Sequence, residues 1–220
     1  MNYYKPLEYI VPPLEDDWML KTILQKRMHI SRSLLTRLKQ TEQGITLNGE
    51  RQYISVKVKA YDRIEVRMQQ EESEDILPQD LPLTILFEDE HLLIVNKEAG
   101  MIVHPTQGHY LNTLANAVVY HWLKQGEKVR FRPIHRLDQE TSGVLAIAKN
   151  PYVHQLVSEQ MIARHTQKEY TALVYGVMAA DKGTVNAPID RDLINPHVRV
   201  VTATGYPSIT HYEVVQRFSQ

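Results

Sequence analysis

The stretch HRLDQETSGVLAIAKN, residues 135–150, places charged side chains directly before an apolar run. Arg136 and Asp138 precede Gly143, and the run VLAIA that follows is typical of a buried strand. Gly143 indicates that the backbone bends sharply or closely approaches another group. An aspartate held at the rim of a core is a candidate for nucleophilic or acid–base chemistry. The structural alternative is an Arg–Asp ion pair that only fixes a loop.

Working outward from this stretch, the sequence alternates short apolar runs with two helical periods. Residues 83–100 predict two strands around the polar turn EDEH, and GMIVHP at 100–105 predicts a third. Helices are predicted at 111–125, with apolar positions from Leu111 to Trp122 on one side, and at 151–163, with Pro151 in the first turn. Further strands are predicted within 169–177, 184–189, 198–203 and 208–218. Many strands joined without helices predict an α+β fold with a mixed, mainly antiparallel sheet.

The charges are segregated along the chain, although the formal net charge is only −1. Residues 20–67 carry eleven Lys and Arg against four acids, whereas residues 68–98 carry one Lys against nine acids. A basic segment of this kind is typical of a protein that binds a phosphate backbone. The alternative is a solvated charged face without a partner.

The basic segment also predicts a compact arrangement of helices and strands. A helix is predicted from Trp18, and a second one over SRSLLTRLKQ, residues 31–40, with Ser31 or Ser33 as its cap. Asn48-Gly49 predicts a hairpin, because a type I′ turn requires positive φ at both central positions. We therefore expect a small helix-helix-sheet domain that precedes the larger one.

Composition shifts divide the chain into four parts, since a polar, acidic and proline-bearing segment is typical of a linker. The predicted parts are an irregular lead-in at 1–17, a helix-helix-sheet domain at 18–67, an acidic linker at 68–82 and a larger domain at 83–220.

Several protein classes are excluded by what the sequence lacks. The absence of cysteine excludes disulfides, a thiolate nucleophile and a Cys-ligated zinc site. No glycine-rich phosphate loop is present, so no nucleotide cofactor is predicted, and His135 with Asp138 lacks the further ligands that a metal site needs. No apolar run is long enough to span a membrane and the first residues do not resemble a secretory signal, so we expect a cytoplasmic protein.

Three ordered motifs resemble those of a known enzyme family. HRLDQETSG at 135–143, DEHLLIVNKEAGMIVHP at 89–105 and KEYTALVYG at 168–176 resemble motifs of the RluA/RluD family of pseudouridine synthases, and the resemblance covers residues 83–220. The segment ISRSLLTRLKQTEQGITLNGE, residues 30–50, resembles an RNA-binding module named after ribosomal protein S four. This S-four-like module commonly precedes the catalytic domain in that family.

The resemblance implies an RNA-modifying isomerase that needs neither a metal nor an organic cofactor. Asp138 corresponds to the catalytic aspartate, acting as a nucleophile at the ribose or as the base of a glycal route. Tyr170 would stack against the uracil ring, although from the residues alone a tyrosine in a strand-like run indicates core packing. Arg136 would occupy the gap left by the flipped base and pair with Asp138, while His135 and Thr141 would contact the substrate.

The implied partner is RNA, either ribosomal or transfer RNA. No interaction with a membrane is expected. Ser31, Arg32, Arg37 and Lys39 are the residues of the S-four-like module that we expect to contact it. We expect a monomer.

Two departures from the family pattern qualify these expectations. Glu98 stands where the family usually has proline, and the chain ends at residue 220, before a further family motif that contributes to the active site. A chain truncated there is expected to be weakly active or inactive. The competing interpretations are a non-catalytic RNA-binding protein and a hydrolase that uses Asp138 on a nucleoside or glycan.

Overall fold

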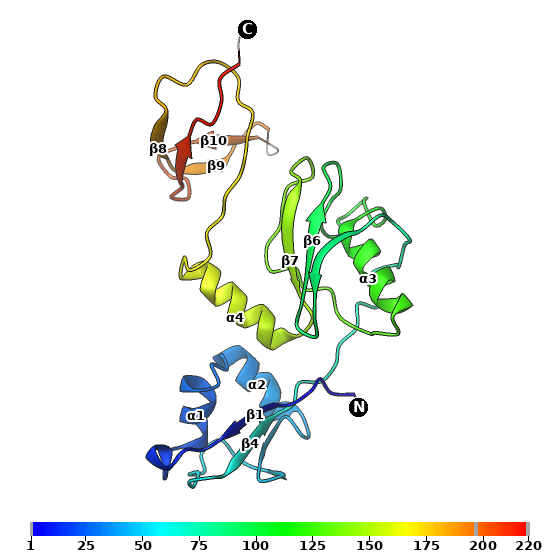
Figure 1. Cartoon of the computed structure of the whole chain (residues 1–220), viewed down its shortest axis with the longest axis vertical. Coiled ribbons are helices and arrows are strands. Elements are labelled where there is room, and N and C mark those ends of the chain that lie inside the picture. The colour runs from blue at the N-terminus through cyan, green and yellow to red at the C-terminus, as the bar shows by residue number, and fades with distance from the viewer. Residues whose placement is uncertain (1, 196–197, 219–220) are drawn as a thin grey trace. The chain divides into compact units, whose positions relative to one another are not determined.

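The structure, a computed structural model, describes residues 2–195 and 198–218 (Figure 1). The chain forms two compact units, Met1–Gln167 and Lys168–Gln220. All strand pairs within the described ranges are antiparallel, and helices accompany the sheets of the first unit. The predicted α+β fold is therefore confirmed.

The first part of the first unit, residues 2–67, is called the N-terminal module. Helices α1 (Leu20–Lys26) and α2 (Arg32–Gln40) accompany a sheet of strand order β1-β4-β2-β3. These strands are β1 (Leu7–Ile10), β2 (Ile45–Leu47), β3 (Glu50–Arg51) and β4 (Arg63–Val66). The expectation of an irregular lead-in at 1–17 is wrong, because β1 pairs with β4 along its whole length.

Local sequence signals explain two boundaries in this module. The Ser31 hydroxyl accepts a hydrogen bond from the Leu34 amide at 3.1 Å and caps α2, since the first amides of a helix have no partner within it. Asn48 and Gly49 have φ values of 53° and 85° between β2 and β3, as the predicted turn requires. The apolar faces of α1 and α2 meet the sheet in one buried cluster that includes Ile64 and Val66.

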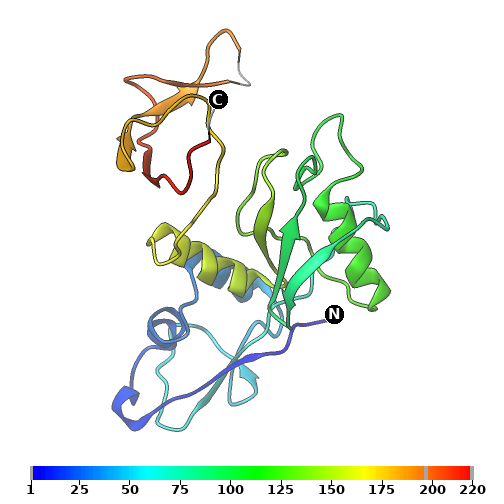
Figure 2. The same ribbon diagram turned by 45° about the horizontal axis from the view of Figure 1, so that its top comes forward.

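The second part of the first unit, residues 83–167, is called the sheet module. Its sheet has the order β5-β6-β7, with β5 (Thr84–Glu88), β6 (Leu92–Lys97) and β7 (Gly143–Ala148). Helix α3 (Leu114–Lys124) lies beside this sheet, and α4 (Pro151–Ile162) follows β7 (Figure 2). Leu114, Val118 and Trp122 share a buried cluster with Leu93 and Leu145, so α3 covers the sheet with its apolar face.

One helix boundary and one strand in the sheet module differ from the predictions. The Thr113 side chain caps α3 in a capping box with Asn116, so Leu111 lies before the helix and is 47% exposed. The strand predicted at 100–105 is wrong, because Ile102 forms only an isolated bridge with Thr113. Pro151 begins α4 as predicted, with the Asn150 side chain as its cap.

A half-buried carboxylate joins the sheet of this module to α3. Glu88 at the end of β5 accepts hydrogen bonds from Trp122 Nε1 at 2.9 Å and from Lys149 Nζ at 3.1 Å, and its other oxygen lies 2.7 Å from His121 Nε2. Burial by itself would raise the pKa of Glu88, but these three donors outweigh burial and lower the pKa.

The segment predicted as an acidic linker at 68–82 makes side-chain contacts with both modules. Glu71 pairs with Arg37 on α2, with Arg130 at 3.0 Å and with Arg132 at 2.9 Å. Burial would raise the pKa of Glu71, but the three guanidinium groups outweigh it and lower the pKa. The helix α4 adds a further contact, since the Tyr152 hydroxyl donates to the Met28 carbonyl at 2.9 Å.

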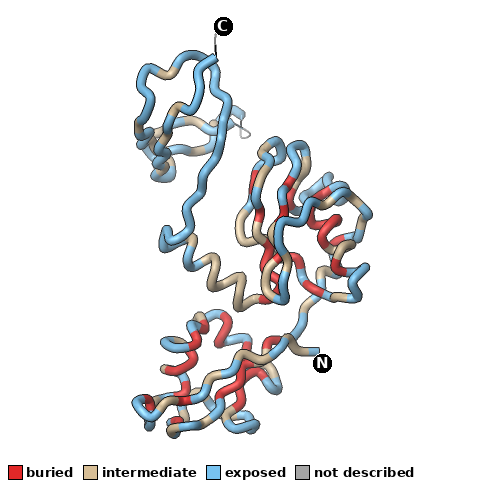
Figure 3. The backbone as a smooth tube through the Cα atoms, in the orientation of Figure 1, coloured by how far each residue is buried: buried red, intermediate tan, exposed pale blue. Residues whose placement is uncertain are grey.

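The second unit contains two two-stranded sheets, formed by β8 (Lys182–Asn186) with β11 (Ile209–Glu213) and by β9 (Ile189–Arg191) with β10 (Arg199–Val201). None of its described residues is buried (Figure 3). The strands predicted at 198–203 and 208–218 correspond to β10 and β11, whereas the single strand predicted at 184–189 is divided between β8 and β9. The additional strand predicted at 169–177 is wrong. That run forms no strand pair with any described residue, and a β-prone sequence without a pairing partner gains no ladder of hydrogen bonds.

Candidate active site

The candidate site lies on the segment that enters β7. Residues 132–134 run alongside this strand, with the Ala148 amide donating to the Arg132 carbonyl and the Ile134 amide to the Ala146 carbonyl, both at 2.9 Å. The chain then turns through residues 135–142 and returns as β7. The predicted catalytic loop is therefore anchored on both sides to the edge strand of a packed sheet.

Within this loop the side chains alternate between the core and solvent. Leu137 is 6% exposed and joins the buried cluster of the sheet module, whereas Arg136 and Asp138 are exposed. Burial of one apolar side chain thus holds the loop while its charged neighbours remain in water. This alternation explains why two charges lie at the mouth of a core strand.

Arg136 and Asp138 form no ion pair with each other or with any other described residue. The structural alternative, in which an Arg–Asp pair fixes the loop, is therefore wrong for this structure. The pairing that the resemblance implies is not formed here either. The carboxylate of Asp138 thus remains open to solvent.

A buried lysine holds the backbone next to Asp138. Lys97, at the end of β6 and 1% exposed, donates from Nζ to the carbonyls of Glu98 and Met101 at 2.8 Å each and of Gln139 at 3.0 Å. The Gln139 carbonyl also accepts from the Gly100 amide at 2.9 Å. Burial lowers the pKa of Lys97, against the opposing influence of the carboxylates of Glu140 and Asp138.

The other residues predicted in this loop are half-buried. Thr141 donates its amide to the Asp138 carbonyl at 3.1 Å and closes the turn, and His135 Nε2 lies 3.2 Å from the Val144 carbonyl. Gly143 has a φ of 129°, which confirms the predicted bend at a position where a side chain would be strained. The structure therefore brings His135, Arg136, Asp138 and Thr141 together in one fixed turn.

Tyr170 belongs to the second unit and is 60% exposed. Core packing, which the residue type alone indicates, is therefore wrong for this tyrosine in the present structure. No strand holds it, since residues 168–174 form neither helix nor strand.

The four residues predicted to bind RNA lie on or beside α2 but differ in their surroundings. Ser31 uses its hydroxyl to cap the helix, and the guanidinium of Arg37 is paired with Glu71. Arg32 and Lys39 are exposed, and neither forms an ion pair with any described residue. The available positive charge on α2 thus comes from Arg32 and Lys39.

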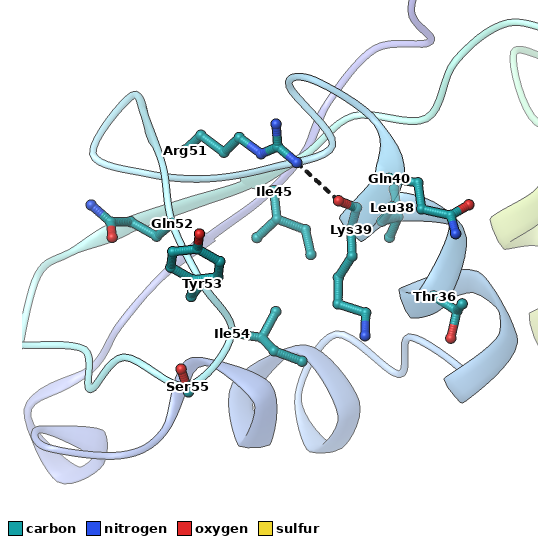
Figure 4. A pocket seen from close by; sticks show the side chains of 10 residues that line it. All are labelled: Thr36, Leu38, Lys39, Gln40, Ile45, Arg51, Gln52, Tyr53, Ile54 and Ser55. Atoms are coloured by element: carbon teal, nitrogen blue, oxygen red, sulfur yellow. Dashed lines mark hydrogen bonds between the residues drawn. The ribbon is translucent and has the colours of Figure 1, made fainter.

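A hollow in the surface lies in the N-terminal module and not at the candidate active site. It has a volume of about 750 Å³ and is lined by residues of α2, β2 and the segment 51–55 in the N-terminal module, Lys39 among them (Figure 4). Within the described ranges, no group of three or more His, Asp or Glu side chains could hold a metal ion. No helix there is long and apolar enough to cross a membrane.

Lys97 and Leu137 position the site but were not singled out by the sequence interpretation. A signal for Lys97 was present, since Leu93, Val95 and Lys97 alternate along β6 and all three are buried. A strand period that places a lysine on the buried face indicates a lysine with specific partners.

The region that contains this site is similar to known RNA pseudouridine synthases. The family model described as RNA pseudouridylate synthase matches residues 91–220. The uncharacterized RNA pseudouridine synthase YhcT of Bacillus subtilis is 34% identical over 209 residues, which cover 95% of this chain and 69% of the relative.

Two other relatives are covered less completely. The uncharacterized RNA pseudouridine synthase YlyB of Bacillus subtilis is 36% identical over 79% of this chain and 58% of its own length. The ribosomal large subunit pseudouridine synthase D of Pseudomonas aeruginosa is 38% identical over 68% of this chain and 47% of its own length. The chain thus spans about half to two thirds of the length of these relatives. From the family match and the similarity to YhcT, we conclude that the chain belongs to the RNA pseudouridylate synthase family.

Proposed function

We propose that this chain converts uridine to pseudouridine in RNA and that Asp138 is its catalytic carboxylate. The observation that carries the proposal is the accessibility of the Asp138 carboxylate, which lies in the region that the family model matches. Its side chain is exposed and has no ion pair among the described residues, while Lys97 and Leu137 fix the backbone on either side. A rigid scaffold that presents an unpaired carboxylate suits chemistry on an incoming ligand.

The reaction exchanges one bond between uracil and ribose for another. The bond from C1′ to N1 breaks, the uracil turns, and a bond from C1′ to C5 forms while the proton on C5 is lost and N1 gains one. Asp138 acts at the sugar, either by attacking C1′ or as the base of a glycal route, and a carboxylate suits a sugar carbon that develops positive charge. Because a stacked base hides its glycosidic bond, the nucleotide must first be flipped out, at a cost of a few kcal/mol.

The other predicted residues take roles that suit their chemistry. Arg136 fills the space left by the flipped base, since a planar guanidinium stacks on bases and its donors reach phosphate or carboxylate. Tyr170 stacks against the uracil, and His135 and Thr141 contact the substrate from the same turn as Asp138. The proposed reaction requires neither a metal ion nor an organic cofactor.

We further propose that the N-terminal module, residues 2–67 with β1 included, is an S-four-like RNA-binding domain, and that residues 83–220 form a catalytic domain. Arg32 and Lys39 would contact phosphate directly. Ser31 would contribute indirectly, because its hydroxyl caps α2 and so fixes the start of the helix that carries Arg32 and Lys39. Ribosomal RNA is the proposed substrate, in line with the name of the relative from Pseudomonas aeruginosa, a ribosomal large subunit pseudouridine synthase. The proposed active form is a monomer.

The test is a product analysis on unmodified ribosomal and transfer RNA transcripts. The chain is used in excess over RNA, so that even a slow conversion is measured, and pseudouridine is mapped by carbodiimide labelling and primer extension. We expect pseudouridine at specific positions of ribosomal RNA without release of free uracil. Release of uracil would instead identify a hydrolase, and a lack of both products would support a protein that only binds RNA.

A further inference from the structure

The hollow in the N-terminal module has an apolar floor. Leu38 and Ile45 are buried beneath it, and Ile54 also lines it, across from Ile45 (Figure 4). Its volume of about 750 Å³ lies within the range of roughly 300–1,000 Å³ that is typical of small-ligand sites. None of its lining residues is acidic, while Lys39 and Arg51 bring positive charge to its rim.

These two cations belong to the minority in this module that the protein does not neutralise itself. Of the eleven Lys and Arg in residues 20–67, six form ion pairs with acids, namely Arg27, Arg37, Lys57, Lys59, Arg63 and Arg67. The remaining five, Lys21, Lys26, Arg32, Lys39 and Arg51, form no ion pair within residues 2–195 and 198–218. The positive charge available to an anionic ligand therefore includes the rim of the hollow.

Tyr53 gives the hollow an aromatic wall. Its side chain is 84% exposed, so the face of the ring is accessible to a ligand. In Figure 4 its ring lies across the hollow from Lys39, with Ile45 and Ile54 between them. An exposed aromatic ring beside cations is the arrangement on which proteins stack the bases of single-stranded nucleic acids.

The walls of the hollow are fixed before any ligand binds. The Lys21 amide donates to the Ile54 carbonyl at 2.9 Å and ties the segment with Tyr53 to the start of α1. Across the rim, the Arg51 guanidinium donates to the Lys39 carbonyl at 3.0 Å and links β3 to α2. A site that is already ordered loses less conformational entropy on binding.

From this geometry we propose that the hollow is a subsite for one unpaired nucleotide of the bound RNA. The base stacks on Tyr53 over the apolar floor, and the phosphates on either side of this nucleotide contact Lys39 and Arg51, one each. A base within a duplex cannot offer its face to the ring, so the subsite selects single-stranded or looped RNA. The proposal rests on the proposed function in that its ligand is RNA, but it does not depend on Asp138 or on catalysis.

The first experiment measures binding of the full chain to a labelled single-stranded oligouridine and to a duplex RNA with the same number of phosphates. We expect Tyr53→Ala to weaken single-strand binding roughly 5- to 100-fold, to leave duplex binding unchanged, and Tyr53→Trp to restore affinity. Tyr61→Ala is the matched control, because Tyr61 is 75% exposed in the same module and does not line the hollow. Equal effects of the Tyr53→Ala and Tyr61→Ala changes would overturn the proposal.

A second experiment follows the salt dependence of single-strand binding. Lys39→Gln and Arg51→Gln should each reduce the slope of log affinity against log salt by about 0.7, the value for one lost contact with a single-strand phosphate. Lys57→Gln is the control, since Lys57 is already paired with Asp17. An equal reduction by Lys57→Gln would contradict the assignment. Pseudouridine formation that requires Asp138 would survive that result, so failure of the subsite and failure of the proposed function are distinguishable.

Discussion

Replacement of Lys97 by methionine tests how the catalytic loop is held. Lys97 is buried, and its ammonium donates three hydrogen bonds to backbone carbonyls, including that of Gln139 next to Asp138. Methionine keeps much of the side-chain volume but donates none of these bonds. The variant therefore loosens the turn without removing any group that we expect to contact the RNA.

The magnitude follows from two opposing contributions. Each hydrogen bond to a charged group contributes about 1.5–3 kcal/mol, whereas keeping an ammonium out of water costs several kcal/mol. We therefore expect Lys97→Met to lower the free energy of unfolding by about 2–4 kcal/mol, a large share of the typical 5–15 kcal/mol. Displacement of Asp138 by about 1 Å would reduce kcat roughly 100-fold, with little change in KM for RNA.

The pH dependence of stability gives an independent reading. Because the folded-state pKa of Lys97 is lowered, the folded protein binds this proton more weakly than the unfolded chain does. The contribution of Lys97 to stability therefore rises as pH increases from the folded-state pKa towards the usual value of 10.5. The stability difference between wild type and Lys97→Met should grow over that window in urea unfolding experiments.

The control is Lys149→Met, which removes a second buried lysine that pairs with Glu88 and Glu127 at the other end of β7. It should lower stability but leave kcat near the wild-type value, when all proteins are assayed at a temperature where they are fully folded. A wild-type kcat for Lys97→Met, or an equal loss of kcat in both variants, would refute the positioning role of Lys97.

Three further outcomes follow from the structure. Arg32→Gln should lower the slope of log RNA affinity against log salt by just under one, as measured by anisotropy titrations. Arg37→Gln should change this slope less, because Glu71 already pairs with that cation. Ser31→Ala should destabilise the protein by about 1 kcal/mol in urea unfolding, through loss of the α2 cap. Glu88 has a lowered pKa, so its stabilisation is present above the usual pKa of 4.5 and is lost as pH falls through its folded-state value. In an acid unfolding experiment, the free energy of unfolding of Glu88→Gln should therefore fall less steeply with decreasing pH than that of the wild type.

Local signals in the sequence predicted much of the first unit. The cap at Ser31, the turn at Asn48-Gly49 and the proline that begins α4 depend on interactions within a few residues, and all three are confirmed. The α+β class followed from the order of such elements. The position of Asp138 at the rim of a core was predicted from one apolar run behind a charged turn.

Features that depend on distant partners were missed. The pairing of β1 with β4 joins segments more than fifty residues apart, and neither segment carries a local signal for it. The run at 169–177 has strong β propensity but lacks a partner strand among the described residues. The roles of Lys97 and Glu71 depend on carbonyls and guanidinium groups supplied by other elements, which spacing alone does not reveal.

The catalytic role of Asp138 is tested most directly by comparing Asp138→Asn with Glu140→Gln, which changes an exposed acid in the same turn. Pseudouridine formation is measured by carbodiimide mapping under single-turnover conditions, with RNA affinity measured in parallel. We expect Asp138→Asn to form no pseudouridine while it binds RNA as tightly as the wild type, and we expect Glu140→Gln to remain active. Pseudouridine formation by Asp138→Asn at the wild-type rate would contradict the catalytic role of Asp138.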